Sequence, residues 1–433
     1  MKRIRPVGLS LLLVLALRAS AALAPLPEDS YFAPFKPEAA PAPSGLMLKQ
    51  GDRLAICGDS ITEQKMYSRI METYLTVCVP QLDITVRQFG WSGERAPGFL
   101  GRMTNDVLRF HPTIATTCYG MNDHRYTPYT EEIGREYRDS SEAIIRSFKA
   151  HGVRVLQGAA GTVGKMPSWV RSATGTVTDL NLGLMELRNI DIDLARQEQV
   201  GFADVYLPML VEGFHAQNRW GTDYMVSGKD GVHPGWAGQL VMAYAFLKGF
   251  GLDGDIGTIT VDLAKGTATA SEGHRVIESA GGVVQLESSR YPFCATGPED
   301  RDDSIRSGME LVPFNQDLNR LMLVARHGTA AKYRVTWSDQ SRIFTAAELA
   351  KGVNLARDFA ENPFSEAFKQ VDEAVGRKQA YETRQIKDLF HGPEGRTDMT
   401  LTEELTEEVR TPLARAIARA FKPVKHTLKV EAE

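Results

Sequence analysis

The chain has 433 residues, a length that suggests about two or three folding units. Hydrophobic residues make up 43% of it and charged residues 24%, a balance that excludes a mainly disordered protein. The formal net charge of -4 is small for this length, so the sequence predicts neither a nucleic-acid partner nor strong attraction to an anionic membrane surface.

The first residues are typical of a signal peptide. A basic start with Lys2, Arg3 and Arg5 precedes an apolar run from Val7 to Leu17, and small residues follow it. The run is too short to span a bilayer comfortably, although a retained anchor is the alternative. We therefore expect residues 1–24 to be removed, no stable membrane insertion, and a secreted or periplasmic protein.

Four cysteines in an exported chain raise the question of disulfide bonds. Cys57 and Cys118 lie in apolar stretches, where buried and unpaired thiols are expected. Cys78 and Cys294 are too far apart in sequence for a prediction. The sequence has no C-x-x-C pair and no histidine pair with helical spacing, so we expect neither a metal nor another cofactor.

The pattern of elements divides the chain. Residues 25–45, rich in proline and alanine, are typical of a linker or a strap across the surface. In residues 46–255 strands alternate with helices, which predicts parallel strands joined by crossover helices in a layered α/β domain. The strands are expected at 53–57, 83–89, 113–119, 153–157 and 202–207, and the helices at 61–77, 130–151, 179–199 and 235–250.

The rest of the chain follows other patterns. Residues 256–344 form short alternating runs punctuated by Gly, Ser, Asp and Pro, which predict a β-sandwich-like antiparallel unit. Residues 345–433 have helical spacing, and residues 345–364 are expected to form one docked helix. We expect this accessory part either to bind a ligand or to brace the α/β domain.

The first candidate for chemistry is Ser60, in the tripeptide Gly58-Asp59-Ser60 between a predicted strand and a predicted helix. A residue after a parallel strand faces the crevice where α/β folds bind ligands. At a helix start it also lies beside free N–H groups, which suit an anionic intermediate. Alternatively, Ser60 serves only as a helix N-cap.

The second candidate is the segment Asp230-Gly-Val-His233, just before the last helix of the α/β part. A histidine can take the proton of a serine if a carboxylate holds it in the right tautomer, and three residues of separation let both side chains meet in one turn. Alternatively, His233 is a plain turn residue before a proline.

The remaining candidates are Gly93, in Gly-Trp-Ser-Gly-Glu after the second strand, and Asn122, in Gly-Met-Asn-Asp after the third. A glycine N–H and an asparagine amide can both donate hydrogen bonds to the oxyanion that develops in acyl transfer. Each segment could instead be an ordinary turn, because Gly, Asn and Asp dominate turns.

In this order and context, the four segments resemble the SGNH (GDSL-like) hydrolase family, whose marker residues would fall on Ser60, Gly93, Asn122 and His233. The resemblance covers about residues 51–250. Ile61 replaces the leucine of the GDSL spelling, and the second segment lacks an asparagine often found before its glycine. The resemblance implies a flavodoxin-like three-layer α/β/α sandwich. It also implies a serine esterase with a Ser-His-Asp triad completed by Asp230.

The substrate is predicted less directly. Four aromatic residues lie beside the four segments, and aromatic faces stack on sugar rings: Trp91, Tyr119, Tyr126 and Trp236. Alternatively, Trp91 and Trp236 pack the loops. Arg125 could meet an acidic sugar or be a solvated surface charge. By resemblance, members with an appended β domain are often carbohydrate O-deacetylases, which suggests an acetylated polysaccharide or oligosaccharide.

Two other functions stay open at this stage. A lipase or lysophospholipase would use the same machinery, and a non-catalytic glycan-binding protein would use the β-rich unit. The sequence carries no signal for the oligomeric state.

Overall fold

The computed structural model of the chain describes residues 26–433. The predicted signal peptide, residues 1–24, lies outside this range, so its cleavage stays a prediction. Within residues 26–433, no helix is both long enough and apolar enough to cross a membrane.

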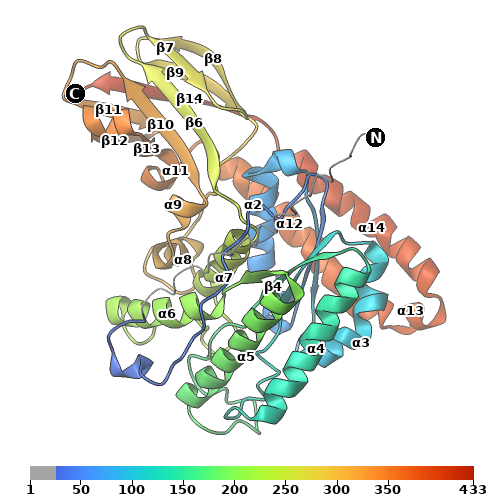
Figure 1. Cartoon of the computed structure of the whole chain (residues 1–433). Helices are drawn as coiled ribbons and strands as arrows, with labels where there is room; N and C mark the ends of the chain where they lie inside the picture. The colour runs from blue at the N-terminus through green and yellow to red at the C-terminus, as the bar shows by residue number, and fades with distance from the viewer. Residues whose placement is uncertain (1–25) are drawn as a thin grey trace, which may run out of the picture.

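A parallel sheet forms the centre of the larger part of the molecule (Figure 1). Its strands lie in the order β2-β1-β3-β4-β5, and every neighbouring pair is parallel. This is the flavodoxin-like order, with β1 and β3 on either side of the point where the strand order reverses. The expected fold class is confirmed. The strands are β1 (Arg53–Gly58), β2 (Thr85–Gly90), β3 (Ile114–Cys118), β4 (Arg154–Gly158) and β5 (Gly201–Ala203).

Helices cover both faces of this sheet, because its strands are apolar on both sides. In β1, Ala55 and Cys57 pack with α3 and α4, whereas Leu54 and Ile56 belong to the core that contains α2 and α7. The helices of this part are α1 (Ser60–Glu63), α2 (Tyr67–Val77), η2 (Pro80–Leu82), α3 (Ala96–Asp106), η3 (Leu108–Phe110), α4 (Glu131–Ala150), α5 (Val177–Glu198), α6 (Tyr206–Trp220) and α7 (Trp236–Gly249).

Two expected elements differ in the structure. The helix expected at 61–77 is broken into α1 and α2, because Lys65 adopts a left-handed backbone with φ of 58°. The strand expected at 202–207 ends at Ala203, since the Asp204 carboxylate accepts a hydrogen bond from the Leu207 amide (3.2 Å) and the chain turns into α6. Helix α3, with a proline in its first turn, was not expected.

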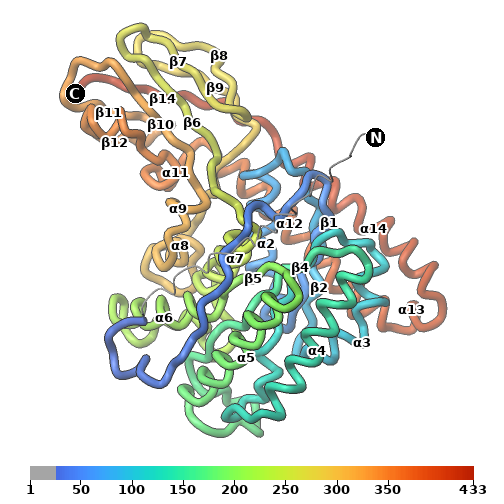
Figure 2. The backbone as a smooth tube through the Cα atoms, viewed as in Figure 1, coloured from blue at the N-terminus to red at the C-terminus, as the bar shows by residue number. Residues whose placement is uncertain are grey.

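The segment before the sheet lies as a strap across the surface, one of the two roles expected for residues 25–45. A 3-10 turn, η1 (Ser30–Phe32), places Phe32 against Phe214 of α6, with ring centroids 5.0 Å apart. Farther along, the Glu38 amide donates to Asn189 of α5 at 3.0 Å. Figure 2 shows this dark-blue segment passing α6 and α5 on its way to β1.

The β-rich unit contains two sheets, in the orders β13-β10-β6-β7 and β12-β11-β14-β9-β8. The expected unit was antiparallel, but β10 pairs with β6 in parallel. After β9 the chain passes through two short helices, α8 and α9, and β10 then begins beside the start of β6. The elements are β6 (Asp255–Asp262), β7 (Thr267–Ala270), β8 (His274–Ala280), β9 (Val283–Ser288), α8 (Ile305–Leu311), α9 (Phe314–Asp317), β10 (Arg320–Arg326), β11 (Lys332–Trp337) and β12 (Gln340–Thr345).

The C-terminal region is not wholly helical as expected. Residues 345–364 form two short helices with β13 between them, because α10 ends at Gly352 and Val353 pairs with β10. The last strand, β14, lies between β11 and β9 (Figure 2), and its residues His426, Leu428 and Val430 alternate inward. The elements are α10 (Ala346–Lys351), β13 (Val353–Asn354), α11 (Leu355–Asp358), α12 (Ser365–Arg384), the π-helical turn η4 (Gln385–Phe390), α13 (Pro393–Thr397), α14 (Met399–Ala420) and β14 (Val424–Ala432).

All four cysteines are buried and have free thiols in the structure, which agrees with the expectation for Cys57 and Cys118. Cys78 and Cys294, for which the sequence gave no prediction, are likewise unpaired.

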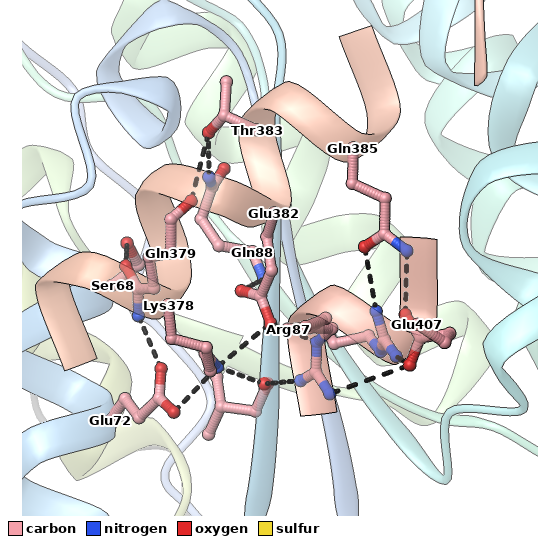
Figure 3. A network of polar contacts seen from close by, with 12 residues as sticks. Ser68, Glu72, Arg87, Gln88, Lys378, Gln379, Glu382, Thr383, Gln385 and Glu407 are labelled. Atoms are coloured by element: carbon pink, nitrogen blue, oxygen red, sulfur yellow. Dashed lines mark hydrogen bonds and ion pairs between the residues drawn. The ribbon is translucent and has the colours of Figure 1, made fainter. Parts of the chain in front are cut away.

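Strand β2 lies at the edge of the parallel sheet, and side chains from the C-terminal helices bond to its free backbone groups (Figure 3). The Gln88 amide donates to Glu382 of α12 at 3.2 Å. The Val86 carbonyl accepts from Lys378 of α12 (2.5 Å) and from Arg410 of α14 (3.1 Å). An uncovered edge strand is an aggregation hazard, so these helices both complete the sheet and protect it.

The same side chains form a buried ionic cluster. The Lys378 ammonium lies 2.7 Å from Glu72 of α2 and 3.1 Å from Glu382, and its side chain is 1% exposed. Burial raises the pKa of Glu72. Burial also opposes ionisation of Glu382, but the cations Lys378 and Arg410 beside it hold its pKa below the ordinary value. Lys378 therefore compensates two buried carboxylates.

Replacing Lys378 by Met should destabilise the protein strongly, because the buried carboxylates Glu72 and Glu382 would lose their shared cation. Breaking a buried pair from one side costs about 3–5 kcal/mol. Denaturant unfolding measures the loss, with Lys369→Met, an exposed position on the same helix, as the control. Equal stability of the two variants would contradict the account.

Candidate active site

Ser60 lies where β1 ends and α1 begins, at the carboxyl edge of the parallel sheet. Asp59 caps this short helix, because its carboxylate accepts a hydrogen bond from the Ile61 amide at 2.9 Å. The alternative of a capping role for Ser60 is therefore not what the structure shows. Ser60 itself is half-buried, and its hydroxyl is free for another partner.

That partner is His233, from the loop before α7. Ser60 Oγ lies 2.8 Å from His233 Nε2, and His233 Nδ1 lies 2.7 Å from a carboxylate oxygen of Asp230. With the proton on Nδ1 donated to Asp230, Nε2 is free to accept the serine proton. The structure thus joins Ser60 to His233 and Asp230, which the sequence placed in a second segment, in one hydrogen-bonded chain.

The backbone of the Asp230 loop fixes this geometry. The second carboxylate oxygen of Asp230 accepts hydrogen bonds from the amides of Val232 (2.9 Å) and His233 (2.8 Å). Burial raises the pKa of Asp230, but these hydrogen bonds and the contact with His233 outweigh it, so the pKa lies below the ordinary 3.8. Gly228 begins the turn with φ of 85°, and a Cβ there would lie 1.7 Å from the His233 carbonyl oxygen. Only glycine fits this position.

Gly93 and Asn122 come to the same edge of the sheet from β2 and β3. Gly93 is exposed and has φ of 74°, a conformation that favours glycine although a Cβ would meet nothing there. The Asn122 amide donates to the Glu94 carbonyl at 3.1 Å and lies 3.4 Å from the Asp59 carboxylate. The segments of Gly93 and Asn122 are therefore in contact with each other and with the neighbour of Ser60.

Tyr126, which the sequence offered as an aromatic residue beside the four segments, is buried in the structure and contacts Asn122. Its hydroxyl donates to the carbonyl oxygen of the Asn122 side chain at 3.2 Å, so it fixes which way the amide points. Arg125 and Tyr126 both have left-handed backbones, with φ of 56° and 57°. Successive non-glycine residues in this conformation store strain, and such strain clusters at functional sites. No sequence pattern signals it.

The predicted substrate-binding residues are placed differently from one another. Tyr119 is 1% exposed and donates to Glu94 at 2.9 Å, so its predicted contact with substrate is wrong: the side chain points into the core behind the site. Arg125 forms ion pairs with Glu132 (3.0 Å) and Glu136, which agrees with its alternative as a surface charge.

The other two predicted substrate contacts are half-buried tryptophans packed against cations. Trp236 has the guanidinium of Arg69 6.0 Å from its ring centre. Trp91 is flanked by Arg102 at 5.0 Å and by Lys387 of η4 at 5.3 Å. These contacts fit the alternative that both tryptophans pack the loops.

The C-terminal region reaches the loop that carries Gly93. Lys387 of η4 lies 2.9 Å from the Glu63 carboxylate, and that carboxylate accepts a hydrogen bond from the Ser92 amide. Burial alone would raise the pKa of Glu63, but the ion pair with Lys387 and the hydrogen bond from Ser92 outweigh burial and lower this pKa. A residue of the C-terminal part thus holds, through one carboxylate, the backbone next to Gly93.

Buried carboxylates stand behind the site. Burial raises the pKa of Asp59 to about 7 and that of Asp123, which accepts hydrogen bonds from the Ala96 and Gly120 amides, to about 6. Within residues 26–433 no three side chains of His, Cys, Asp or Glu gather in a way that could hold a metal ion.

The fold and the four convergent segments define a layered α/β hydrolase domain. Residues 56–241 match the GDSL-like Lipase/Acylhydrolase family, as the SGNH resemblance predicted. The chain therefore carries an ester hydrolase domain of this family. No curated protein sequence matches the chain.

Solved structures extend the likeness in fold to most of the chain. BT4096, described as a gut microbial diltiazem-metabolizing enzyme, covers 90% of this chain and 100% of its own, with a TM-score of 0.70 and 20% identity. Axe2, an acetylxylan esterase from Geobacillus stearothermophilus, covers 48% of this chain and 97% of its own, with a TM-score of 0.39 and 19% identity. The likeness to BT4096 shows that both share the parallel-sheet fold and its accessory part.

The raised pKa of Asp59 predicts a pH-dependent stability. With a folded pKa of about 7 against an ordinary value of 3.8, the folded protein keeps a proton that the unfolded chain releases, so stability falls as pH rises through this window. Asp59→Asn keeps the capping oxygen and cannot ionise. Its unfolding free energy relative to the parent should rise by about 3 kcal/mol between pH 4 and pH 7 and level off near pH 8.

Denaturant unfolding across this range measures the difference, with Asp339→Asn, an exposed aspartate, as the control. A difference between Asp59→Asn and the parent that did not change with pH would contradict the assigned pKa.

Proposed function

We propose that the protein is an exported serine esterase that hydrolyses small acyl esters, above all acetyl esters, on a carbohydrate. The observation that carries the proposal is the hydrogen-bonded chain from Ser60 through His233 to Asp230 at the carboxyl edge of a GDSL-like domain. The proposed export rests on the basic and apolar start of the sequence.

The first half of the reaction acylates the serine. His233 Nε2 takes the proton of Ser60 as its Oγ attacks the ester carbonyl carbon, and the carbonyl electron pair moves to the oxygen. When the intermediate collapses, the bond between acyl carbon and alcohol oxygen breaks, and His233 returns the proton to the departing alcohol. Asp230 stabilises the imidazolium in between.

The second half releases the acid. A water molecule gives a proton to His233 and attacks the acyl carbon, and the bond to Ser60 Oγ breaks as His233 returns the proton to it. In both halves the backbone amides of Ser60 and Gly93 and the side-chain amide of Asn122 hold the oxyanion. Tyr126 and the Glu94 carbonyl orient that side chain.

The carbohydrate substrate is supported by the resemblance to SGNH proteins with an appended β domain. The chain has such a unit, built from β6 to β14. The many contacts of α12 and α14 with β2 and α2 favour a bracing role for the C-terminal helices. A lipase or lysophospholipase is the second candidate, because the same three residues would serve a long acyl chain.

Ser60→Ala should abolish ester turnover, since no other hydroxyl is bonded to His233 in the structure of residues 26–433. We expect kcat for acetate release to fall about a thousandfold or more. The assay uses acetylated polysaccharides and simple acetyl esters, with circular dichroism to show that the fold is intact. Ser44→Ala, an exposed serine in the strap, is the control.

A series of esters with increasing acyl length separates the candidates. The proposal expects kcat/KM to be greatest for acetyl esters, whereas a maximum at long chains would favour a lipase. Parental rates in Ser60→Ala would contradict the esterase mechanism itself.

A further inference from the structure

One tryptophan differs from the others in its surroundings. Of the five tryptophans in the chain, Trp337 is buried and Trp91, Trp220 and Trp236 are half-buried, but Trp169 is 47% exposed. Its ring lies beside the imidazole of His233, with ring centroids 5.8 Å apart and planes inclined by 32°. A large apolar face is thus open to solvent next to the histidine of the site.

The loop that carries Trp169, residues 159–176 between β4 and α5, is anchored on both sides of the site. The Gly164 amide donates to the Gly231 carbonyl, in the histidine loop, at 2.8 Å. The Thr174 amide donates to the Tyr126 carbonyl, in the asparagine loop, at 3.0 Å. The loop therefore bridges the two loops that supply His233 and Asn122.

Within this loop, the apolar side chains are divided. Met166, Val170 and Ala173 are partly buried and pack against the main core, while Trp169 is left outside. Two turn hydrogen bonds, from Val170 to Pro167 (3.2 Å) and from Ala173 to Val170 (3.0 Å), hold the backbone around Trp169. The exposed ring thus stands on a fixed backbone that is tied to the core.

The position of His233 decides which part of the ester would meet this ring. His233 must hand its proton to the departing alcohol oxygen, so the alcohol part of the ester lies on the His233 side of Ser60. The oxyanion donors Gly93 and Asn122 come from β2 and β3 and hold the carbonyl oxygen. Trp169, in contact with His233, is therefore on the alcohol side of the site.

We propose that Trp169 is the platform on which the sugar ring of the alcohol part stacks during acylation. This inference rests on the proposed function and adds to it the residue that selects the alcohol. The C–H groups on one face of a pyranose form a flat apolar surface that matches an indole in size, and tryptophan offers this contact with little loss of side-chain freedom.

This role has a kinetic consequence that separates it from a structural one. The alcohol leaves when the acyl-enzyme forms, so Trp169 contributes to kcat/KM, which reports acylation, and not to the hydrolysis of the acetyl-enzyme. The fall in kcat/KM caused by removing the Trp169 ring should therefore depend on the alcohol part of the ester and not on its acyl part.

The test compares Trp169→Ala with the parent on three acetyl esters: a mono-acetylated methyl glucoside, benzyl acetate and ethyl acetate. We expect kcat/KM to fall about tenfold for the glucoside, the size of one stacked ring contact, and less than about twofold for ethyl acetate. The deacylation rate of the acetyl-enzyme, formed from p-nitrophenyl acetate, should be unchanged. Trp169→Phe should recover part of the loss, and Ser172→Ala, exposed in the same loop, should match the parent.

The results distinguish a stacking role of Trp169 from a purely structural one. An equal fall for all three esters would show that Trp169 only supports His233 and would overturn the inference, as would a fall confined to benzyl acetate. Absence of Ser60-dependent turnover in the parent would instead refute the proposed function. The two failures are therefore distinguishable.

Discussion

The parallel direction of β2, β1 and β3 is the constraint on which the site depends. Because all three strands run the same way, the loops after them meet at one edge of the sheet, at the point where the strand order reverses. Those loops carry Gly93, Ser60 and Asn122, and the loop before α7 brings His233 to within 2.8 Å of Ser60. Ser60 and His233, which are 173 positions apart in sequence, thus meet at this edge of the sheet.

The accessory part acts on the site through the edge of this sheet. Side chains of α12 and α14 bond to the backbone of β2 where a further strand would otherwise lie, and the buried Lys378 joins them to α2. Lys387 then holds Glu63, which binds the Ser92 amide next to Gly93. The position of Gly93, the proposed oxyanion donor, therefore depends on residues more than 290 positions away in sequence.

The sequence was sufficient where local patterns carry the information. Alternating strands and helices predicted the layered fold, and the order of the motifs placed Ser60 and Asn122 at strand ends and His233 just before the last helix of the α/β part. It failed where burial decides the outcome. Tyr119, at the end of a predicted strand, and Trp169, in the loop after the next strand, are both aromatic, and only packing leaves Tyr119 buried and Trp169 exposed. Strand β14 does alternate in the sequence, but its partners, β9 and β11, lie far away in the chain.

Labelling by a serine-directed phosphate ester is the most direct test of the central claim. The full chain would be incubated with diethyl p-nitrophenyl phosphate and digested with a protease, and the masses of its peptides would be measured by mass spectrometry. The hydrogen-bonded chain through His233 and Asp230 predicts one diethylphosphoryl group, on the peptide that contains Ser60, and a loss of esterase activity that parallels the labelling. Labelling of a different serine, or full ester turnover after Ser60 is labelled, would contradict the assignment of Ser60 as the nucleophile.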